Sequence, residues 1–415
     1  MITSTSFSSL SLTKPILQAI DEMGFSEATP VQTQVIPEGN NGRDILAAAQ
    51  TGTGKTLAYL VPIFDQMVRF YGSKRPKGNK GPYALILAPT RELAQQIATC
   101  ASTIALTAQF RITTAVGGKK YSTQISNIKK GCDILIATPG RLIDLLDQNI
   151  LSLRNIHYFV LDEVDRMMDM GFWPSVSKLV KQLPAERQTF LLSATLSQEV
   201  LNKASLIQHD PVHIETTPVT ETADTVQEFL LPVATRQKQN LLLALLQEKG
   251  SQRVLVFTHT KQEADLCAHK LQNDHINAES IHSDKPQRKR DKILERFKNG
   301  TLDVLVATDV LARGIDITDV HYVVNFTVPE SPDDYIHRIG RTGRAGVQGA
   351  AYTLMAPEEL LTLREIEYHT ANLLELYDVP EFAYDVDRLV PNPNRPTKRG
   401  ARRTAHTCRL RLGRC

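Results

Sequence analysis

Short apolar runs alternate with longer segments of mixed polarity in the first half of the chain. The runs are DILAAA (44–49), YALILAPT (83–90), CDILIATP (132–139), HYFVLDE (157–163) and TFLLSAT (189–195). Near-continuous apolar runs of this length are typical of strands that are buried on both faces of a parallel sheet. Residues 90–105 carry apolar side chains at helical spacing, with Thr90 as the expected N-cap. This alternation predicts a doubly wound α/β domain.

The same rhythm restarts in the second half. Its runs are RVLVFTHT (253–260), AESIH (278–282), DVLVATD (303–309) and HYVVNF (321–326). Because ILIATPG and VLVATDV resemble each other, we expect two related α/β domains in tandem. They should join near residues 209–225, which are rich in Pro, Thr and acidic residues. After about Pro391 the chain is basic and has no acidic residue, which predicts a disordered tail.

Composition narrows the class of protein. The 415 residues exceed what one compact core usually holds, so two domains are expected. Hydrophobic residues make up 42% and charged residues 22%, as in ordinary soluble proteins. With a net charge of +3, any basic partner surface must be local. No apolar run is long enough to span a membrane and the N-terminus does not resemble a secretory signal, so no membrane association is expected.

Cysteine usage points to a reducing environment. The five cysteines show neither CxxC nor Cys/His ligand spacing. Neither a zinc site nor a disulfide framework is therefore expected. A cytoplasmic location is the default expectation.

Polar clusters follow the predicted strands of the first domain. They begin after Ala49 and lie at 89–91, 138–141, 162–165 and 193–195. In open parallel sheets, ligands bind beyond the carboxyl ends of the strands. The clusters therefore predict a single binding edge.

The segment AAAQTGTGKT, which follows the first strand, is predicted to bind a polyphosphate. Gly52 and Gly54 permit a tight turn, and successive N–H groups with the next helix N-terminus offer a positive cradle. Lys55 would reach the β- and γ-phosphates, and Thr56 would ligate Mg²⁺. Ala49 stands where the general pattern G-x-x-x-x-G-K-[ST] has its first Gly. The alternative is a glycine-rich turn without a ligand.

Three carboxylates gain roles beside such a loop. Asp162 would be the second Mg²⁺ anchor, and Glu163 would orient or deprotonate the attacking water. Asp165 would hold a link to Ser193 or Thr195. Solvated loop acids are the alternative.

Eight motifs appear in order along about residues 5–360: GFSEATPVQ, AQTGTGKT, PTRELA, TPGR, DEVD, SAT, ATDVLARGID and HRIGRTGR. They resemble the DEAD-box ATP-dependent RNA helicases, and DEVDRMMDMGF with the short N-terminus resembles the bacterial RhlE-type subgroup most. The resemblance implies two tandem RecA-like domains, each a parallel sheet flanked by helices, with the active site in the inter-domain cleft. The boundaries it implies are an N-terminal helix and Q motif (1–35), an ATP-binding domain 1 (36–210), a linker (211–225), a C-terminal domain 2 (226–375) and an extension with a basic, disordered tail (376–415).

The resemblance implies ATP as the nucleotide. Within GFSEATPVQ, Gln32 would pair with a donor and an acceptor edge of adenine, and Thr29 would support that loop. Phe25 and the upstream Phe7 would pack near the base. The loop residues expected at the nucleotide are Ala49, Gln50, Thr51, Gly52, Thr53, Gly54, Lys55 and Thr56.

Further catalytic residues are implied in the second domain. Arg341 and Arg344 would act as arginine fingers that stabilise charge at the γ-phosphate. His337 would help to place the water. In the RGID sequence, Asp316 would contact the ribose and Gly314 would permit a close turn.

RNA is implied across both domains, bound through phosphates, sugars and 2′-OH groups largely without regard to sequence. The matching positions are Pro89, Thr90, Arg91, Gly117, Gly118, Thr138 and Arg141 in the first domain, and Thr258, Gln287, Arg290 and Thr308 in the second. Aromatic residues make up only 6% of the chain, and no stacking platform for base reading is evident. Taken singly, each position is equally a turn or surface residue.

Two departures from the family pattern stand out. Val164 replaces the usual Ala, and we expect it to face the core and crowd it modestly while activity survives. Ser283 stands where the family commonly has Gly. The nearby cations Lys285, Arg288 and Lys289 would either strengthen phosphate contact or cover a solvated helix.

These features predict a monomer that couples RNA-stimulated ATP hydrolysis to local unwinding or remodelling of short RNA duplexes or ribonucleoproteins. The alternatives are an ATP-regulated RNA clamp or scaffold and a relative that acts on DNA. Ribosome-assembly and RNA-decay proteins are both compatible partners. The basic tail would either tether RNA or only solubilise the chain; its cations are Arg395, Lys398, Arg399, Arg402, Arg403, Arg409, Arg411 and Arg414.

Overall fold

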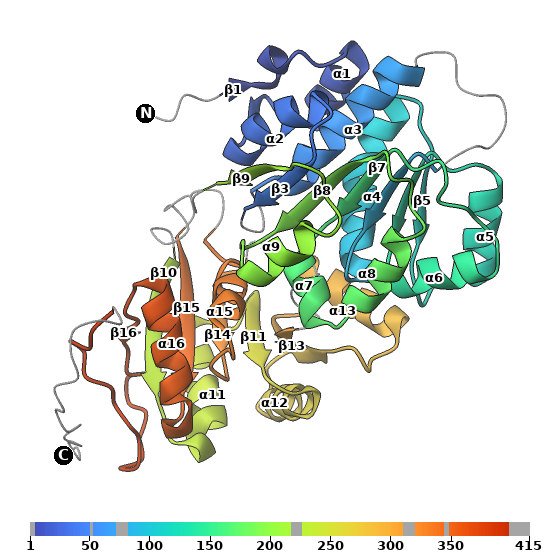
Figure 1. Ribbon diagram of the computed structural model, residues 1–415. Coiled ribbons are helices and arrows are strands. Elements are labelled where there is room, and N and C mark those ends of the chain that lie inside the picture. The colour runs from blue at the N-terminus through green and yellow to red at the C-terminus, as the bar shows by residue number, and fades with distance from the viewer. Residues whose placement is uncertain are drawn as a thin grey trace. The chain divides into compact units, whose positions relative to one another are not determined.

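The protein divides into two compact units, Met1–Val219 and Thr220–Cys415 (Figure 1). The computed structural model describes residues 5–49, 53–71, 82–216, 226–309, 320–343 and 348–397. Each unit has its own sheet and its own buried clusters. Within those ranges, no helix combines the length and the hydrophobicity that a membrane crossing needs.

Unit 1 is built on a seven-stranded parallel sheet. In spatial order its strands are β5 (Ile112–Ala115), β6 (Ile134–Ala137), β4 (Ala84–Leu87), β7 (Tyr158–Leu161), β8 (Gln188–Ser193), β3 (Ile45–Ala48) and β9 (Val212–Glu215). The five inner strands confirm the predicted apolar runs. The edge strands β5 and β9 escape the prediction because they are only partly buried and carry no continuous apolar run. β9 places residues 212–215 in this sheet rather than in a linker.

Helices cover both faces of this sheet. One layer consists of α1 (Lys14–Glu22), α2 (Pro30–Asn40), α3 (Lys55–Tyr71) and α4 (Arg91–Thr107). The other consists of α5 (Tyr121–Lys129), α6 (Pro139–Asp147), α7 (Val164–Asp169), α8 (Trp173–Val180) and α9 (Gln198–Ala204). Along β4, Leu85 and Leu87 face the second layer while Ile86 faces the first. Burial on both faces is the reason that the strands read as unbroken apolar runs.

The N-terminal segment packs on the core of unit 1. A two-residue antiparallel pair joins β1 (Thr5–Ser6) to β2 (Glu27–Ala28), and a 3₁₀ turn, η1 (Phe7–Leu10), follows β1. Ile16, Ile20 and Val35 are buried in the same cluster as the strands. The segment is therefore built into this unit.

Unit 2 repeats the design with a second seven-stranded parallel sheet. Its strands, in spatial order, are β12 (Ala278–Ile281), β13 (Val304–Thr308), β11 (Val254–Thr258), β14 (Tyr322–Asn325), β15 (Gly349–Met355), β10 (Val226–Pro232) and β16 (Glu375–Leu376). The first four confirm predicted runs. Sequence patterning misses β10 and β15, because both mix polar with apolar residues.

Two helical layers also enclose this sheet. α11 (Lys238–Lys249) and α12 (Lys261–Asn273) pack on one face. α13 (Gln287–Lys298), α15 (Pro332–Ile339) and α16 (Leu360–Thr370) pack on the other. Two 3₁₀ turns, η2 (Thr235–Gln237) and η3 (Pro357–Glu359), precede α11 and α16.

Residues 377–397 form an ordered strap on unit 2. Val379 is buried, and Phe382 and Tyr384 pack against the same hydrophobic cluster as α11. Arg395 is 8% exposed and forms an ion pair with the fully buried Glu367 of α16. The expected disorder from Pro391 onward is therefore wrong for 391–397, and Arg395 is not a free cation; the remaining tail lies outside the described residues.

Candidate active site

The predicted phosphate loop joins β3 to α3 at the carboxyl edge of the unit 1 sheet. Lys55, the first residue of α3, is 8% exposed. Its Nζ donates to the carbonyl oxygens of Ala49 at 2.6 Å and Ser193 at 3.2 Å, which lie at the ends of β3 and β8. Thr53 and Thr56 are half-buried beside it. Three residues expected here lie outside the described residues: Gln50, Thr51 and Gly52.

Gln32 connects the start of α2 to the phosphate loop. Its Oε1 accepts from the backbone N–H of Thr29 at 2.9 Å, and its Nε2 donates to the carbonyl of Gly54 at 3.1 Å. Gly54 has φ of +89°, and a Cβ atom there would clash with the Gln32 amide. Of the two expected aromatic residues, Phe7 is buried in the core, whereas Phe25 is 46% exposed.

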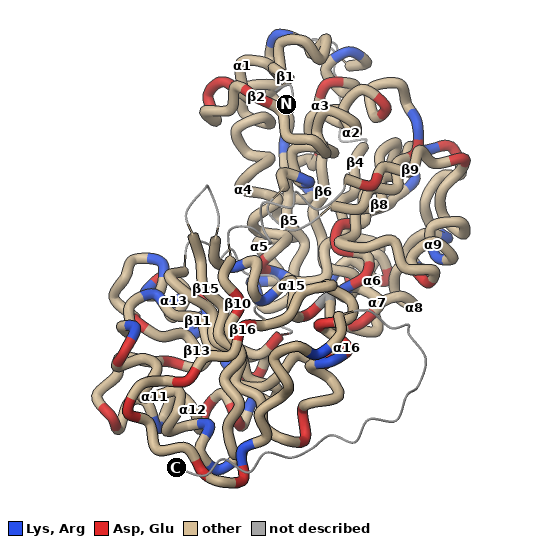
Figure 2. Tube along the Cα trace, turned by 90° about the vertical axis from the view of Figure 1, so that its left-hand side faces the viewer, with Lys and Arg blue, Asp and Glu red and all other residues tan. Residues whose placement is uncertain are grey.

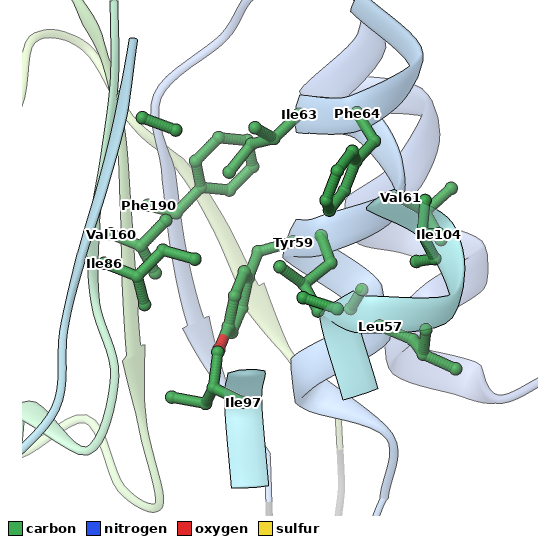
Figure 3. Close-up of a cluster of buried hydrophobic side chains, with 14 of the residues drawn as sticks. Leu57, Tyr59, Val61, Ile63, Phe64, Ile86, Ile97, Ile104, Val160 and Phe190 are labelled. Atoms are coloured by element: carbon green, nitrogen blue, oxygen red, sulfur yellow. The ribbon is translucent and has the colours of Figure 1, made fainter. Parts of the chain in front are cut away.

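Asp162 directly follows β7 and is only 3% exposed to solvent. Tyr59 of α3 is fully buried within the cluster shown in Figure 3, and its hydroxyl donates to Oδ2 of Asp162 at 2.9 Å. Burial raises the pKa of Asp162 from 3.8 to about 6, although Lys55 and the Tyr59 hydrogen bond act in the opposite direction and Glu163 adds to the rise. A negative charge here is costly unless a cation joins it.

Glu163 occupies a constrained backbone position before α7. Its φ of +55° and ψ of +58° are in the left-handed region, which a Glu adopts only when its surroundings hold it there. Its Oε2 accepts from Nη1 of the buried Arg166 at 3.1 Å. The carboxylate is thus fixed beside Asp162.

The other two members of the DEVD tetrad face inward. Val164 is fully buried in the second helical layer of unit 1, which confirms that it faces the core. Oδ2 of Asp165 accepts from the backbone N–H of Ala194 at 2.8 Å, so the tetrad is tied to the SAT motif. Ala194 lies between the two expected partners, of which Ser193 is buried and Thr195 half-buried.

Two glycines of unit 1 lie against an arginine from the PTRELA motif. Thr90 caps α4 by accepting from the N–H of Leu93 at 3.2 Å, which confirms the predicted cap. Arg91 follows it, and its guanidinium lies against Gly117 and Gly118, where added Cβ atoms would meet its nitrogens. The preceding Pro89 is buried. The structure thus brings these expected positions together.

Thr138 and Arg141 lie at the start of α6. Thr138 is the N-cap residue, and the guanidinium of Arg141 lies 4.8 Å from the centroid of the Tyr121 ring. Its Nε is 3.9 Å from Oδ2 of Asp144, beyond hydrogen-bond distance. Within the described part of the chain, the buried Nε and Nη1 of Arg141 have no hydrogen-bond acceptor. An anionic ligand would satisfy such donors.

The expected positions of unit 2 gather at one edge of its sheet. Thr258 and Thr308 are paired residues at the carboxyl ends of β11 and β13. Gln287 is the first residue of α13, and its Oε1 accepts from Nη2 of Arg290. The strand register thus places Thr258 and Thr308 side by side at the carboxyl edge of the sheet.

Arg338, which the motif interpretation passed over, is the anchor of α15. It is 1% exposed and binds Asp309 in a bidentate manner, Nε to Oδ1 at 2.6 Å and Nη2 to Oδ2 at 2.7 Å. His337 and Arg341 flank this anchor; Arg341 is buried. Three other expected residues lie outside the described ranges: Gly314, Asp316 and Arg344.

Comparison with known proteins decides the family. Residues 29–203 match the DEAD/DEAH box helicase family, and residues 237–346 match the helicase conserved C-terminal domain. An ATP-dependent RNA helicase RhlB from Pseudomonas syringae pv. tomato is 41% identical over 367 residues, which cover 88% of this chain and 92% of that protein. The chain belongs to the DEAD-box ATP-dependent RNA helicases.

Other DEAD-box helicases agree. The DEAD-box ATP-dependent RNA helicase CshA from Geobacillus kaustophilus is 38% identical over 376 residues, 91% of this chain and 79% of that protein. S. cerevisiae Dbp5 bound to RNA and ADP BeF3 matches with a TM-score of 0.80 and 27% identity, over 91% of this chain and 96% of that chain. Mss116p bound to ssRNA and AMP-PNP also matches with a TM-score of 0.80, at 29% identity over 91% and 80%. The narrower RhlE-type assignment stays a prediction.

Sequence reasoning missed the supporting side chains of this helicase site. Tyr59 lies within an apolar helical pattern, so nothing local marks it as the partner of Asp162. Arg166 lies in DEVDRMMDMGF and Arg338 lies in HRIGRTGR, so their positions within these motifs could have identified them as supporting residues. Asp309 follows an apolar strand directly, as Asp162 does, and that shared position could have identified it.

Proposed function

We propose that this DEAD-box helicase couples RNA-stimulated hydrolysis of ATP to ADP and phosphate to local separation of short RNA duplexes or remodelling of ribonucleoproteins. The observation that carries the proposal is the carboxyl edge of the unit 1 sheet. There the ammonium of Lys55 follows β3, and the buried carboxylate of Asp162 and the constrained Glu163 follow β7, the two strands on either side of β8. This set supplies a phosphate clamp, a metal anchor and a group that acts on water.

The residues present fit ATP with Mg²⁺. Lys55 is held by two neutral carbonyls, so its charge is poised for the β- and γ-phosphates. Thr56 and Asp162 would hold the metal, which neutralises charge on the phosphates when bound. Asp162 supports this assignment because a nearby cation relieves the cost of its buried charge. Gln32 retains one amide hydrogen and one lone pair beyond its two bonds for an adenine edge.

Glu163 is proposed to orient or deprotonate the attacking water. Its ion pair with Arg166 and its left-handed backbone hold the carboxylate in one place, which is what a positioned general base needs. Arg341 and Arg344 are proposed to stabilise charge at the γ-phosphate in the protein bound to ATP and RNA, with His337 placing the water.

RNA binding is proposed for the motif residues at the carboxyl edge of each sheet. The related Dbp5 and Mss116p structures have RNA or ssRNA bound to those proteins. Arginine, threonine hydroxyl and glycine N–H groups suit contacts to phosphates and sugars, so the binding is expected to be largely independent of sequence.

We propose a cytoplasmic monomer whose partners are ribosome-assembly or RNA-decay proteins.

The first test is steady-state ATP hydrolysis by the full chain with no nucleic acid, with single-stranded RNA and with DNA of matched sequence. Stimulation by RNA and not by DNA is the expected result. Equal stimulation by DNA would favour a DNA-acting relative. Hydrolysis that ignores RNA while RNA still binds would favour an ATP-regulated clamp.

Replacement of the proposed base is a sharper prediction. Glu163→Gln should lower the RNA-stimulated rate by about 10²- to 10⁴-fold, because the amide cannot take a proton, while ATP and RNA affinities change little. Glu186→Gln, which alters an exposed glutamate before β8, is the matched control. Wild-type turnover by the Glu163 variant would show that another group acts on the water.

A further inference from the structure

The outer side of α13 carries three exposed cations. The inner side is set by buried residues at helical spacing: Arg290, Ile293 and Phe297. Arg288, Lys289 and Lys292 are exposed, and we call them the α13 triad. Lys292 lies four residues from Arg288 and three from Lys289, so the side chains are neighbours on the helix surface.

The positive charge of the α13 triad is not compensated. Within the described ranges, no carboxylate forms an ion pair with any of its members, whereas Lys238 and Arg296 of the same unit pair with Glu359 and Glu279. Of the two acids in the described helix, Asp291 accepts from Nε2 of Gln287 at 2.8 Å, and Glu295, three residues from Lys292, forms no ion pair with it. Figure 2 shows lysine and arginine positions gathered along α13.

The α13 triad lies in the first two turns of its helix, close to the binding edge of the sheet. β12 ends at Ile281, so the chain reaches the carboxyl edge of the sheet before α13 begins at Gln287. This is the edge that holds Thr258 and Thr308. Gln287 and Arg290, both proposed to contact RNA, are on the same turns as the triad, with Arg290 on the inner side of the helix. The positive end of the helix dipole adds to the attraction for anions.

The loop before α13 is held by its neighbour α12. Nζ of Lys261 lies 2.6 Å from Oδ1 of Asp284, and Oδ1 of Asp265 lies 3.0 Å from Nζ of Lys285 and 3.0 Å from Nε2 of His282. Lys285 is therefore engaged within the protein and does not belong to the triad. The same contacts fix the start of α13, so the triad is presented on a rigid element.

We propose that the α13 triad extends the RNA contact of unit 2 by binding phosphates of a single strand next to Gln287 and Arg290. The inference rests on the proposed RNA-binding function and enlarges its interface. At this helical spacing the Cβ atom of Lys292 is about 5–6 Å from those of Arg288 and Lys289, close enough for neighbouring phosphates of one strand. The aromatic residue of α13, Phe297, is buried and cannot stack on a base. The added contact is therefore expected to be independent of RNA sequence.

The test is binding of a fluorescent single-stranded RNA to the full chain, with a non-hydrolysable ATP analogue, over a series of salt concentrations. The triple variant R288Q/K289Q/K292Q should bind about tenfold more weakly at physiological salt. The slope of log Kd against log salt should become shallower by about 0.7 for each phosphate that the variant no longer neutralises. ATP affinity and hydrolysis without RNA should match wild type, because these residues lie outside the nucleotide site.

Two further variants make the result specific. K129Q/K130Q/R154Q removes the same charge from exposed positions of unit 1 and should keep the wild-type slope. R288K/K289R/K292R exchanges the cations and should keep the wild-type affinity. The proposal is overturned if R288Q/K289Q/K292Q retains the wild-type affinity and slope, or if the unit 1 control weakens binding as much. If wild type itself fails to bind RNA, the proposed function falls and takes this inference with it.

Discussion

The carboxylate of Asp162 is buried in surroundings that favour a cation as its partner. Desolvation opposes its negative charge, yet the Tyr59 hydroxyl and the nearby Lys55 stabilise that charge in part. Without a metal beside it, the group is therefore ionised at a cost in folding free energy. Mg²⁺ would reduce this cost, so metal affinity and the destabilising effect of the buried charge have the same origin.

Asp162→Asn should reveal that cost as a pH-dependent stability difference. A carboxyl group whose pKa is higher in the folded than in the unfolded protein loses stability as the pH rises above its unfolded value, and the full loss is reached above about pH 6. Without metal, the variant should therefore gain on wild type by on the order of 1–2 kcal/mol between about pH 5 and about pH 8. Urea unfolding at both pH values measures this gain.

The matched control for this prediction is Asp147→Asn, which changes a carboxylate that is exposed and paired with Lys178. Its difference from wild type should vary much less between the two pH values. An Asp162 variant whose stability difference is equal at both pH values would contradict the buried-charge explanation. RNA-stimulated hydrolysis should also be abolished, because the proposed metal anchor is gone.

At the scale of elements, the starts of α2 and α3 act together. Gln32, on α2, closes over Gly54, the residue just before α3, and the left-handed backbone of that glycine leaves no room for a side chain. Gln32, which we propose to bind adenine, is therefore coupled mechanically to the phosphate loop. Disturbing one should alter the other.

Gly54→Ala tests this coupling. The new methyl group should displace the Gln32 amide and break its hydrogen bond, which lowers ATP-analogue affinity about five- to tenfold. Gly24→Ala is the matched control, because Gly24 has a similar φ of +80° but nothing within 4 Å of an added Cβ. Both variants should be destabilised by about 1–2 kcal/mol of backbone strain. Equal ATP-analogue affinities for the two variants would show that the Gln32 hydrogen bond does not contribute to nucleotide binding.

At the scale of the whole molecule, the strap (residues 377–397) completes unit 2. It follows β16 at the sheet edge, covers α11 and ends with Arg395 bound to Glu367. The fully buried Glu367 pairs with Arg364 of its own helix and with Arg395, so the return of the chain to α16 supplies a second cation to this buried charge. Unit 2 therefore extends beyond residue 375, where the sequence predicts the end of domain 2.

Arg395→Ala should destabilise unit 2 by about 2–3 kcal/mol, because the buried Glu367 would lose the hydrogen bonds from Arg395 and keep its ion pair with Arg364. Arg388→Ala is the control, since Arg388 pairs with the 59%-exposed Asp378 and should cost about 1 kcal/mol or less. Trp173, the single tryptophan of the chain, reports on unit 1. In urea unfolding of the Arg395→Ala variant, circular dichroism should therefore show a transition at a lower urea concentration than in wild type, whereas the transition in Trp173 fluorescence should not move. A shift of both signals together would mean that the two units unfold as one.

Sequence patterning predicts strands best where they are buried on both faces. β4, β6 and β7 are continuous apolar runs, and each lies inside the run that predicts it. Edge strands such as β5 and β16 need few apolar residues, because solvent or a loop covers one side, and they leave no such run. The sequence predicts disorder at the end of the strap because that segment is basic. The composition does not show that Arg395 has a buried partner.

The sequence by itself determined the chemistry of this protein: which residues are candidates for phosphate, metal, water and RNA roles, the order of the motifs and the tandem α/β plan. Local order suffices for these, because each motif is a short segment at the end of a strand. Only the tertiary structure decided the partners. Tyr59 and Asp162 are 103 positions apart, Arg338 and Asp309 are 29, and Arg395 and Glu367 are 28. Such pairs form through strand register and helix packing, which no local pattern encodes.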